Sequence, residues 1–229
     1  MAKSLYQKIQ EKNIEPKHVA EVGVYYPHFS NIYGFIKDGV RTTLVEPDPE
    51  SIRQIRSHFA DNKNVTLFEV AIFDHDGTVE LVKKEASTYV KGLESSPCLA
   101  NSVNNSKTDE LVAVKAVTFN HIDDGSIELL SIDIEGGEWY VVKHMVSRPS
   151  VISIETHGGA YVNPFIKEIT EWMNTNDYSI WFKNKTDTVY IKNGSIKVSK
   201  AEKIVLILQN CYNFVNRIRK SIKMYYLKK

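Results

Sequence analysis

The sequence LLSIDIEGGEW at residues 129–139 joins an apolar run, broken only by Ser131 and Asp133, to a Gly-Gly pair that opens a helical pattern. A short, nearly continuous apolar run is typical of a strand buried on both faces of a parallel sheet. The helical pattern ends before Pro149, which cannot continue a helix. The stretch therefore predicts a strand followed by a helix, the repeating unit of an α/β fold.

The same alternation extends on both sides of this unit. We expect strands at 18–24, 42–46, 65–72, 129–134 and 151–155, helices at 29–37, 49–59 and 164–173, and a hairpin formed by 179–183 and 187–192. Asp48 is expected to cap the second helix and Pro49 suits its first position. The fold class is α/β, a doubly wound, mostly parallel, Rossmann-like sheet with a C-terminal antiparallel hairpin.

The middle of the chain departs from this alternation. The Asp-Gly pair within residues 74–77 indicates a hairpin into an extended run at 78–82. Residues 111–119 form another extended run, for which we expect an edge strand. The polar stretch between them, residues 85–109, has the length and composition of a substrate-facing loop.

Charge divides the chain into two parts. Its 229 residues carry a net charge of +1, but residues 200–229 hold eight basic residues against Glu202, a net +7 that leaves −6 for residues 1–199. We expect a domain at 1–199 and a basic helical tail at 200–229. With two distant cysteines, a polar N-terminus and no apolar run of about 20 residues, the sequence favours a reduced, cytoplasmic protein without a transmembrane segment.

Ligands of open parallel sheets bind beyond the carboxyl ends of the strands. After the first strand these positions are Glu21, Gly23, Val24 and Tyr25, and Glu46 ends the second strand at the spacing of a ribose-binding acid. Neither GxGxxG nor GxxxxGK[ST] is present, which argues against a dinucleotide and against a phosphate-cradling loop. Acidic residues at both tips suit a ligand with a ribose, little phosphate and positive charge, such as S-adenosylmethionine.

Five segments carry a family resemblance: AEVGV (20–24), LVEPDPE (44–50), VAIFDHDGTVEL (70–81), LLSIDIEGGEW (129–139) and ISIETHG (152–158). Together they resemble the class I S-adenosylmethionine-dependent methyltransferases, and most closely the FkbM family of O-methyltransferases, over residues 18–192. The family's usual Asp-x-Gly-Ala-Asn-x-Gly loop differs here at four positions, which hold Glu21, Val24, Tyr25 and Pro27.

The resemblance implies a set of cofactor contacts. Glu21 and Gly23 would line the methionine moiety and Glu46 would bind the ribose. The residues expected to flank the adenine are Pro47, Asp48, Ala71 and Ile72. Asp133 would lie beside the transferred methyl group.

Methyl transfer to a hydroxyl needs a group that takes the proton, and acidic or basic residues cluster on two neighbouring strand tips. The candidate catalytic residues are Asp133, Glu135, Glu155 and His157; Glu138 suits either this cluster or the helix dipole. Mg²⁺ is an open possibility, held by Asp133, Glu155 and His157.

The tail has its own pattern. Apolar residues recur at spacings of 4 and 3 at Ile204, Leu208, Cys211, Val215, Ile218, Ile222 and Tyr225. Such a helix docks on its own domain, pairs with a twin subunit in a homodimer, or touches an anionic membrane as a peripheral contact.

The leading hypothesis is an O-methyltransferase acting on a sugar hydroxyl in a glycan or glycosylated metabolite. The sugar follows from the family resemblance. The alternative is a degenerate S-adenosylmethionine-binding module that acts in assembly through its tail, and a nicotinamide oxidoreductase ranks third. A nucleic-acid substrate is disfavoured because the body is acidic and the Asn-Pro-Pro-aromatic motif is absent.

Overall fold

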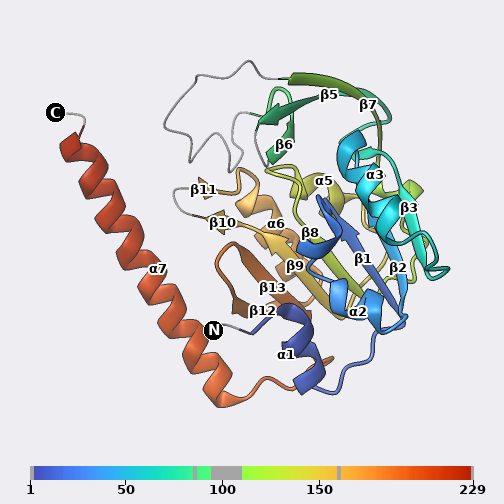
Figure 1. The fold of residues 1–229 in the computed structure, drawn as a ribbon. Coiled ribbons are helices and arrows are strands. Elements are labelled where there is room, and N and C mark those ends of the chain that lie inside the picture. The colour runs from blue at the N-terminus through green and yellow to red at the C-terminus, as the bar shows by residue number, and fades with distance from the viewer. Residues whose placement is uncertain (1–2, 85–86, 94–109, 159–160, 228–229) are drawn as a thin grey trace.

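The computed structural model describes residues 3–84, 87–93, 110–158 and 161–227 (Figure 1). A seven-stranded sheet in the order β12-β13-β9-β8-β1-β2-β3 forms its centre. Its strands are β1 (His18–Val22), β2 (Arg41–Val45), β3 (Val65–Phe68), β8 (Leu129–Ile132), β9 (Val151–Glu155), β12 (Tyr178–Lys183) and β13 (Asp187–Lys192). The predicted α/β fold with a mostly parallel sheet and a C-terminal antiparallel hairpin is confirmed.

The parallel strands end together at one edge of the sheet. Val22 pairs with Val45 of β2 on one side and with Ile132 of β8 on the other, so the tips of β1, β2 and β8 lie side by side. Chain connections leave β1 in opposite directions, which makes this edge the switch point of a doubly wound sheet.

Helices cover both faces of the sheet. Alternate side chains of a strand point to opposite faces, so each face has apolar side chains that a layer of helices buries. Ala20 packs with one core cluster and Val19 with the other. The helices are α1 (Leu5–Glu11), α2 (Tyr33–Lys37), α3 (Pro49–His58), α5 (Glu138–Lys143), α6 (Ile166–Thr175) and the long α7 (Lys200–Leu227), with short 3-10 turns η1 (Pro27–Phe29) and η2 (Phe119–His121). The first cluster contains α5 and α6, the second α1, α2 and α3.

A second sheet lies at the edge where the parallel strands end (Figure 1). Its order is β4-β7-β5-β6, formed by β4 (Ala71–Ile72), β5 (Gly77–Lys84), β6 (Ser87–Val90) and β7 (Glu110–Val117). Its strands line the cavity described below. The extended runs predicted at 78–82 and 111–119 are confirmed as parts of β5 and β7, but the sequence did not predict that they belong to a separate sheet.

The second sheet corrects four expectations. The strand expected at 65–72 is split, because β2 ends at Val45 and β4 pairs with β7 instead. β7 lies between β4 and β5 and is not an edge strand. The turn at 74–77 joins β4 to β5, which are not neighbours, and the hairpin partner of β5 is β6. β6 also occupies part of the loop expected at 85–109, of which residues 94–109 lie outside the described residues.

Two smaller differences concern local elements. The helix expected at 29–37 is divided into η1 and α2. A short hairpin of β10 (His157–Gly158) and β11 (Tyr161–Val162) follows β9. The predicted cap of α3 is confirmed, since the Asp48 side chain accepts a hydrogen bond from the Ser51 amide.

The tail forms α7 as predicted, and Figure 1 shows it leaving the domain beside α1 and β12 and standing clear of the sheet at its far end. Its first turn is attached by Glu202, which accepts hydrogen bonds from Lys12 and from Trp181. The described residues include no helix with the length and apolar composition required to cross a membrane.

Gly23 is the tightest point at the strand tips. It has φ +82°, and a Cβ atom there would lie 1.7 Å from the carbonyl oxygen of Asp133. Gly194 has nearly the same φ, +84°, but a Cβ atom added there would have no other atom within 4 Å. The two glycines therefore separate the cost of the backbone conformation from the cost of the clash.

We predict that Gly194→Ala lowers the free energy of unfolding by about 1–2 kcal/mol, the cost of a left-handed alanine. Gly23→Ala should lower it by at least about 3 kcal/mol more, because neighbouring backbone must shift. Urea unfolding of both variants tests this. Equal losses would show that the strand tips adapt without cost.

Candidate active site

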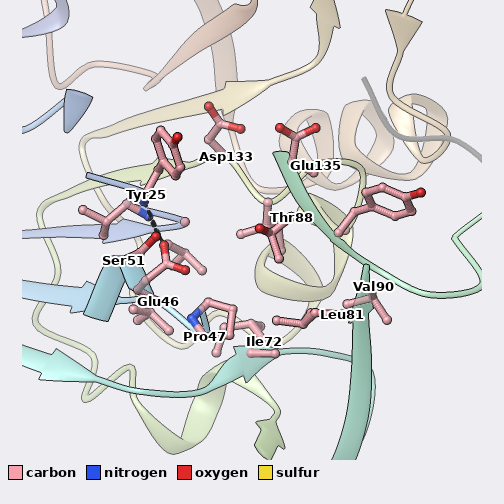
Figure 2. A pocket seen from close by; sticks show the side chains of 18 of the residues that line it. Tyr25, Glu46, Pro47, Ser51, Ile72, Leu81, Thr88, Val90, Asp133 and Glu135 are labelled. Carbon is pink, nitrogen blue, oxygen red and sulfur yellow. Dashed lines mark hydrogen bonds between the residues drawn. The ribbon is translucent and has the colours of Figure 1, made fainter. Parts of the chain in front are cut away.

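A cavity of about 440 Å³ lies at the carboxyl ends of β1, β2 and β8 (Figure 2). Its volume is within the range of about 300–1,000 Å³ typical of small-molecule sites. Predicted cofactor residues that line it are Glu21, Gly23, Val24, Tyr25, Glu46, Pro47, Ala71, Ile72 and Asp133. Of the predicted catalytic residues, Asp133 and Glu135 line it.

Glu21 lies at the tip of β1 and is almost completely buried. Its Oε1 accepts a hydrogen bond from the Asn31 amide at 2.8 Å, whereas Oε2 has no partner among the described residues. Burial raises the pKa of Glu21 to about 8, and the charges of Asp187 and Glu46 act in the same direction. An orphaned, buried carboxylate oxygen facing a cavity is a binding position for a donor or a cation.

Glu46 holds the loop after β1. Its Oε2 accepts hydrogen bonds from the amides of Val24 (3.0 Å) and Tyr25 (2.8 Å), and its Oε1 accepts one from Asp48 (2.9 Å). Burial raises the pKa of Glu46 to about 7, although these amides oppose the shift. Tyr25 has φ +57°, an unusual conformation for a bulky residue, and Figure 2 shows its amide joined to Glu46.

Asp48 does not line the cavity. Its Oδ2 accepts hydrogen bonds from the amide and hydroxyl of Ser51, both at 2.9 Å, and its Oδ1 accepts one from Lys83 at 3.2 Å. Burial raises the pKa of Asp48, but the bonds from Ser51 and Lys83 outweigh it and lower the pKa. The structure therefore gives Asp48 a capping role.

The loop after β8 is held in a similar way. Glu135 has φ +58° and points into the cavity beside Asp133 (Figure 2). The Oε1 atom of Glu138 accepts hydrogen bonds from the amides of Ile134 and Gly136, each at 3.1 Å, and its Oε2 accepts one from Asn163. Glu138 is fully buried, which raises its pKa to about 7.

Asp133, Glu138 and Glu155 form a compact group, of which Asp133 lines the cavity. One carboxylate oxygen from each lies within 4.8 Å of the others. Burial, followed by the charges of Asp187 and Glu135, raises the pKa of Asp133 well above its usual range. Burial and the charge of Asp133 raise the pKa of Glu155 to about 10.

Two of the three predicted metal ligands, Asp133 and Glu155, belong to this group, and its third member is Glu138, not His157. Two buried oxygen atoms near the group, Glu155 Oε2 and the Tyr161 hydroxyl, have no hydrogen-bond partner among the described residues. Burial, together with the carboxylates of Glu138 and Glu155, raises the pKa of Tyr161. An oxygen-rich, negatively charged group with orphaned atoms fits a hard divalent cation.

His157 is not brought to the cavity lining. Its Nδ1 atom lies 2.9 Å from the Thr156 hydroxyl, and its Nε2 atom lies 3.3 Å from the Asn184 carbonyl. The antiparallel pairing of His157 with Val162 directs the backbone into the short β10–β11 hairpin. The structure therefore gives no support for His157 as a base.

Sequence reasoning missed one wall of the cavity. Side chains of the second sheet and of the loops beside it line this wall: Phe73, Leu81, Thr88, Tyr89, Val90 and Leu93. Tyr140 of α5 completes it and contacts Phe73, with 4.8 Å between the centroids of the two tilted rings. Alternation of apolar and polar residues in 78–82 was a signal for the strand, but not for where it would pack.

The described cavity lining contains four carboxylates and no lysine, arginine or histidine. Buried carboxylates without a cation repel each other and hold protons at unusually high pH. The arrangement favours a ligand that carries positive charge and donates hydrogen bonds, and it disfavours one with several phosphates.

Residues 18–180 match the family model of the methyltransferase FkbM domain. A search of curated proteins gave no significant match. Similar solved structures include a Staphylococcus aureus protein classed as a caffeoyl-CoA O-methyltransferase, with 13% identity, coverage of 84% of this chain and 85% of the other, and a TM-score of 0.46.

Two further structures were solved with a ligand. Cofactor-bound Rv0187 from MTB is 13% identical, with coverage of 84% of this chain and 82% of that chain and a TM-score of 0.45. Fibrillarin from Aeropyrum pernix in complex with S-adenosyl-L-methionine is 10% identical, with coverage of 82% and 74% and a TM-score of 0.42.

We predict that the ligand-free protein loses stability as pH rises from 5 to 8. Unfolded glutamates ionise near pH 4.5, but burial keeps Glu138 and Glu46 protonated to about pH 7 in the folded chain and Glu21 to about pH 8. The contribution of each such group to the free energy of unfolding is fully present below its pKa in the unfolded chain. It is lost as the pH rises through its pKa in the folded chain. One fully buried group such as Glu138 contributes about 3 kcal/mol.

Urea unfolding at several pH values measures this dependence. Glu138→Gln should reduce the slope, since the amide does not titrate, while Glu171→Gln on the exposed surface of α6 should leave it unchanged. A free energy of unfolding that is constant or rises between pH 5 and 8 would contradict the prediction.

Proposed function

The chain belongs to the FkbM methyltransferase family and is an S-adenosylmethionine-dependent methyltransferase, and from that premise we propose that it methylates a hydroxyl group of a sugar in a glycan or glycosylated metabolite. The observation that carries the proposal is the cavity at the tips of β1, β2 and β8, with its four carboxylates and no basic side chain in the described lining. S-adenosylmethionine brings a sulfonium and an ammonium group, which such a site can neutralise.

The cofactor would lie along the strand tips. The orphaned Oε2 of Glu21 suits the ammonium group, and Gly23 allows the backbone to approach the methionine end. Glu46 has one free acceptor position beyond the three amides it already binds, enough for a ribose hydroxyl. Pro47, Ala71 and Ile72 offer an apolar surface for the adenine.

S-adenosylmethionine supplies an electrophilic methyl group, and the protein must align a hydroxyl with it and remove the hydroxyl proton. Asp133 and Glu135 are the two acids that face the cavity at the tip of β8. Burial and neighbouring negative charge raise the pKa of Asp133, so that its ionised form is a stronger base than an ordinary aspartate. We assign proton removal to Asp133 and acceptor positioning to Glu135.

A sugar acceptor rests on the family resemblance, and the rim of the cavity supports it. Phe29 lines the cavity while 71% of its surface is exposed, and its ring lies 5.9 Å from that of Tyr25. Flat aromatic surfaces with a polar edge accept ligands that have one apolar and one hydroxylated face. Phe29 and Tyr25 would therefore hold the acceptor at the entrance.

A divalent cation such as Mg²⁺ would be held by Asp133, Glu138 and Glu155, whose oxygen atoms suit it. It would orient and acidify the acceptor hydroxyl. In that case Asp133 would act as a ligand and Glu135 would remain to accept the proton.

Two other functions give different expectations. A degenerate module would bind S-adenosylmethionine without turnover, and the altered loop at Val24, Tyr25 and Pro27 motivates it. A nicotinamide oxidoreductase would need donors for the pyrophosphate, and the described lining offers no basic side chain for it.

We predict that S-adenosylmethionine binds more tightly as pH rises from 6 to 8. Glu46 has a pKa of about 7 and Glu21 one of about 8, and both must ionise to receive the cofactor. Ionisation of Glu46 alone gives about a tenfold gain. Calorimetry in buffers of different ionisation enthalpy should show proton release on binding.

S-adenosylhomocysteine, which keeps the ammonium and the ribose but lacks the sulfonium, is the control ligand: it should release the protons of Glu21 and Glu46 but not those that the sulfonium displaces from Asp133. Glu46→Gln should weaken binding and flatten its pH dependence. Identical proton release for both ligands would argue against neutralisation of the carboxylates by the sulfonium.

Labelled methyl transfer to a panel of glycans tests the reaction itself. Asp133→Asn should lower kcat by about 10²–10⁴-fold, the usual contribution of a positioned base, and Glu171→Gln should not change it. Calorimetry with S-adenosylhomocysteine shows whether the variant still binds the cofactor.

Each outcome separates the candidates. Full activity of Asp133→Asn would exclude Asp133 as the base, and tight binding without transfer to any acceptor would favour the module. Loss of activity with EDTA, restored by Mg²⁺, would support the cation site, and Glu138→Gln should then raise the Mg²⁺ concentration required.

A further inference from the structure

The long helix α7 is attached to the domain only near its start, as far as the structure describes it. Ser199 caps the helix by accepting a hydrogen bond from the Glu202 amide, and the Glu202 carboxylate is bonded to Lys12 at 2.7 Å and to Trp181 at 2.9 Å. After this turn the helix continues through a further 25 residues to Leu227. This attachment leaves Glu202, Leu206 and Gln209 half-buried on one face of the helix, whereas the opposite face is exposed where its side chains are described.

That surface is unusually apolar. Five large aliphatic side chains of α7 are between 45% and 62% exposed: Ile204, Val205, Ile207, Leu208 and Val215. Elsewhere the described residues expose large apolar side chains only singly, as at Leu111 and Val146. The start of α7 contacts β12, as expected for a helix that docks on its own domain, but the domain does not cover the predicted apolar positions Ile204, Leu208 and Val215. A contiguous exposed apolar surface of this kind marks an interaction site.

The shape of the apolar surface limits what covers it. At about 100° per residue, Ile207, Ile204, Leu208 and Val205 span about 160° of the helix circumference. A two-stranded coiled coil buries a narrower seam of alternate positions. A broad apolar face suits a helix that lies in an interface, with one half immersed.

The charge of residues 200–229 also favours an interface with lipid. Residues 200–229 carry eight basic residues and one acid, and that acid, Glu202, is already bonded to Lys12 and Trp181. Two parallel copies would bring two charges of +7 together without an acidic partner, which opposes self-association. An anionic lipid surface complements this charge and gains about 1 kcal/mol for each lysine or arginine near it.

We propose that α7 is a membrane-surface helix, which places the exposed aliphatic side chains of Ile204, Val205, Ile207, Leu208 and Val215 among the acyl chains and basic side chains such as Lys203 and Arg219 among anionic phospholipid head groups. The helix lies on the bilayer and does not cross it. This interaction adds a location to the methyltransferase domain and does not depend on its acceptor.

Co-sedimentation of the full-length protein with vesicles tests the proposal. The protein should bind vesicles of phosphatidylcholine containing phosphatidylserine and bind much less to phosphatidylcholine alone, and high salt should weaken the binding. The double variant Ile204→Glu with Leu208→Glu should reduce the affinity at least tenfold. Lys203→Gln and Arg219→Gln, both at exposed positions, should each reduce it about fivefold for the anionic vesicles.

Matched controls are available outside α7. Leu111→Glu and Val146→Glu change side chains that are 48% and 53% exposed, and both should keep full vesicle binding. S-adenosylhomocysteine binding by every variant shows that the domain is folded. Because the vesicle assay uses neither cofactor nor acceptor, its result is independent of the proposed reaction.

Two results would overturn the proposal. Vesicle binding that is equal for the α7 variants and the wild type would place the contact elsewhere. No vesicle binding, combined with a dimer in light scattering that Leu208→Glu abolishes, would assign the face to a second copy of the chain.

Discussion

Buried glutamates that accept backbone N–H groups hold the strand tips on which the site depends. Glu46 binds the amides of the loop after β1, and Glu138 binds those of the loop after β8. Each fixes a bulky residue with positive φ, Tyr25 in one loop and Glu135 in the other. Such conformations persist only where surrounding contacts determine them. Removing either carboxylate would free the loop that lines the cavity.

This support has an electrostatic cost. Together with Glu21, Asp133 and Glu155, the same glutamates bring several carboxyl groups into one buried place. Burial and their mutual repulsion raise the pKa values of these groups. A cationic ligand relieves that repulsion as it binds. The carboxylates therefore favour the positively charged S-adenosylmethionine, and the divalent cation proposed above would be favoured for the same reason.

The sequence predicted the alternating strands and helices of the main sheet, because the spacing of apolar residues indicates which faces are buried. It located Glu21, Glu46, Asp133 and Glu135, since residues after parallel strands share one edge. It missed the second sheet, whose position depends on the long-range pairing of β4 with β7. It also chose His157 over Glu138 beside Asp133, because sequence order does not reveal that the β10–β11 hairpin takes the imidazole elsewhere.

The bond between Lys12 and Glu202 joins positions 190 residues apart, and it brings α1 to the base of α7. The chain is thereby closed almost from end to end without a covalent link. Glu202 thus connects α1, through Lys12, and β12, through Trp181, to the first turn of α7. Loosening of α1 would therefore release the base of α7, so the N-terminal helix contributes to the attachment of the last one.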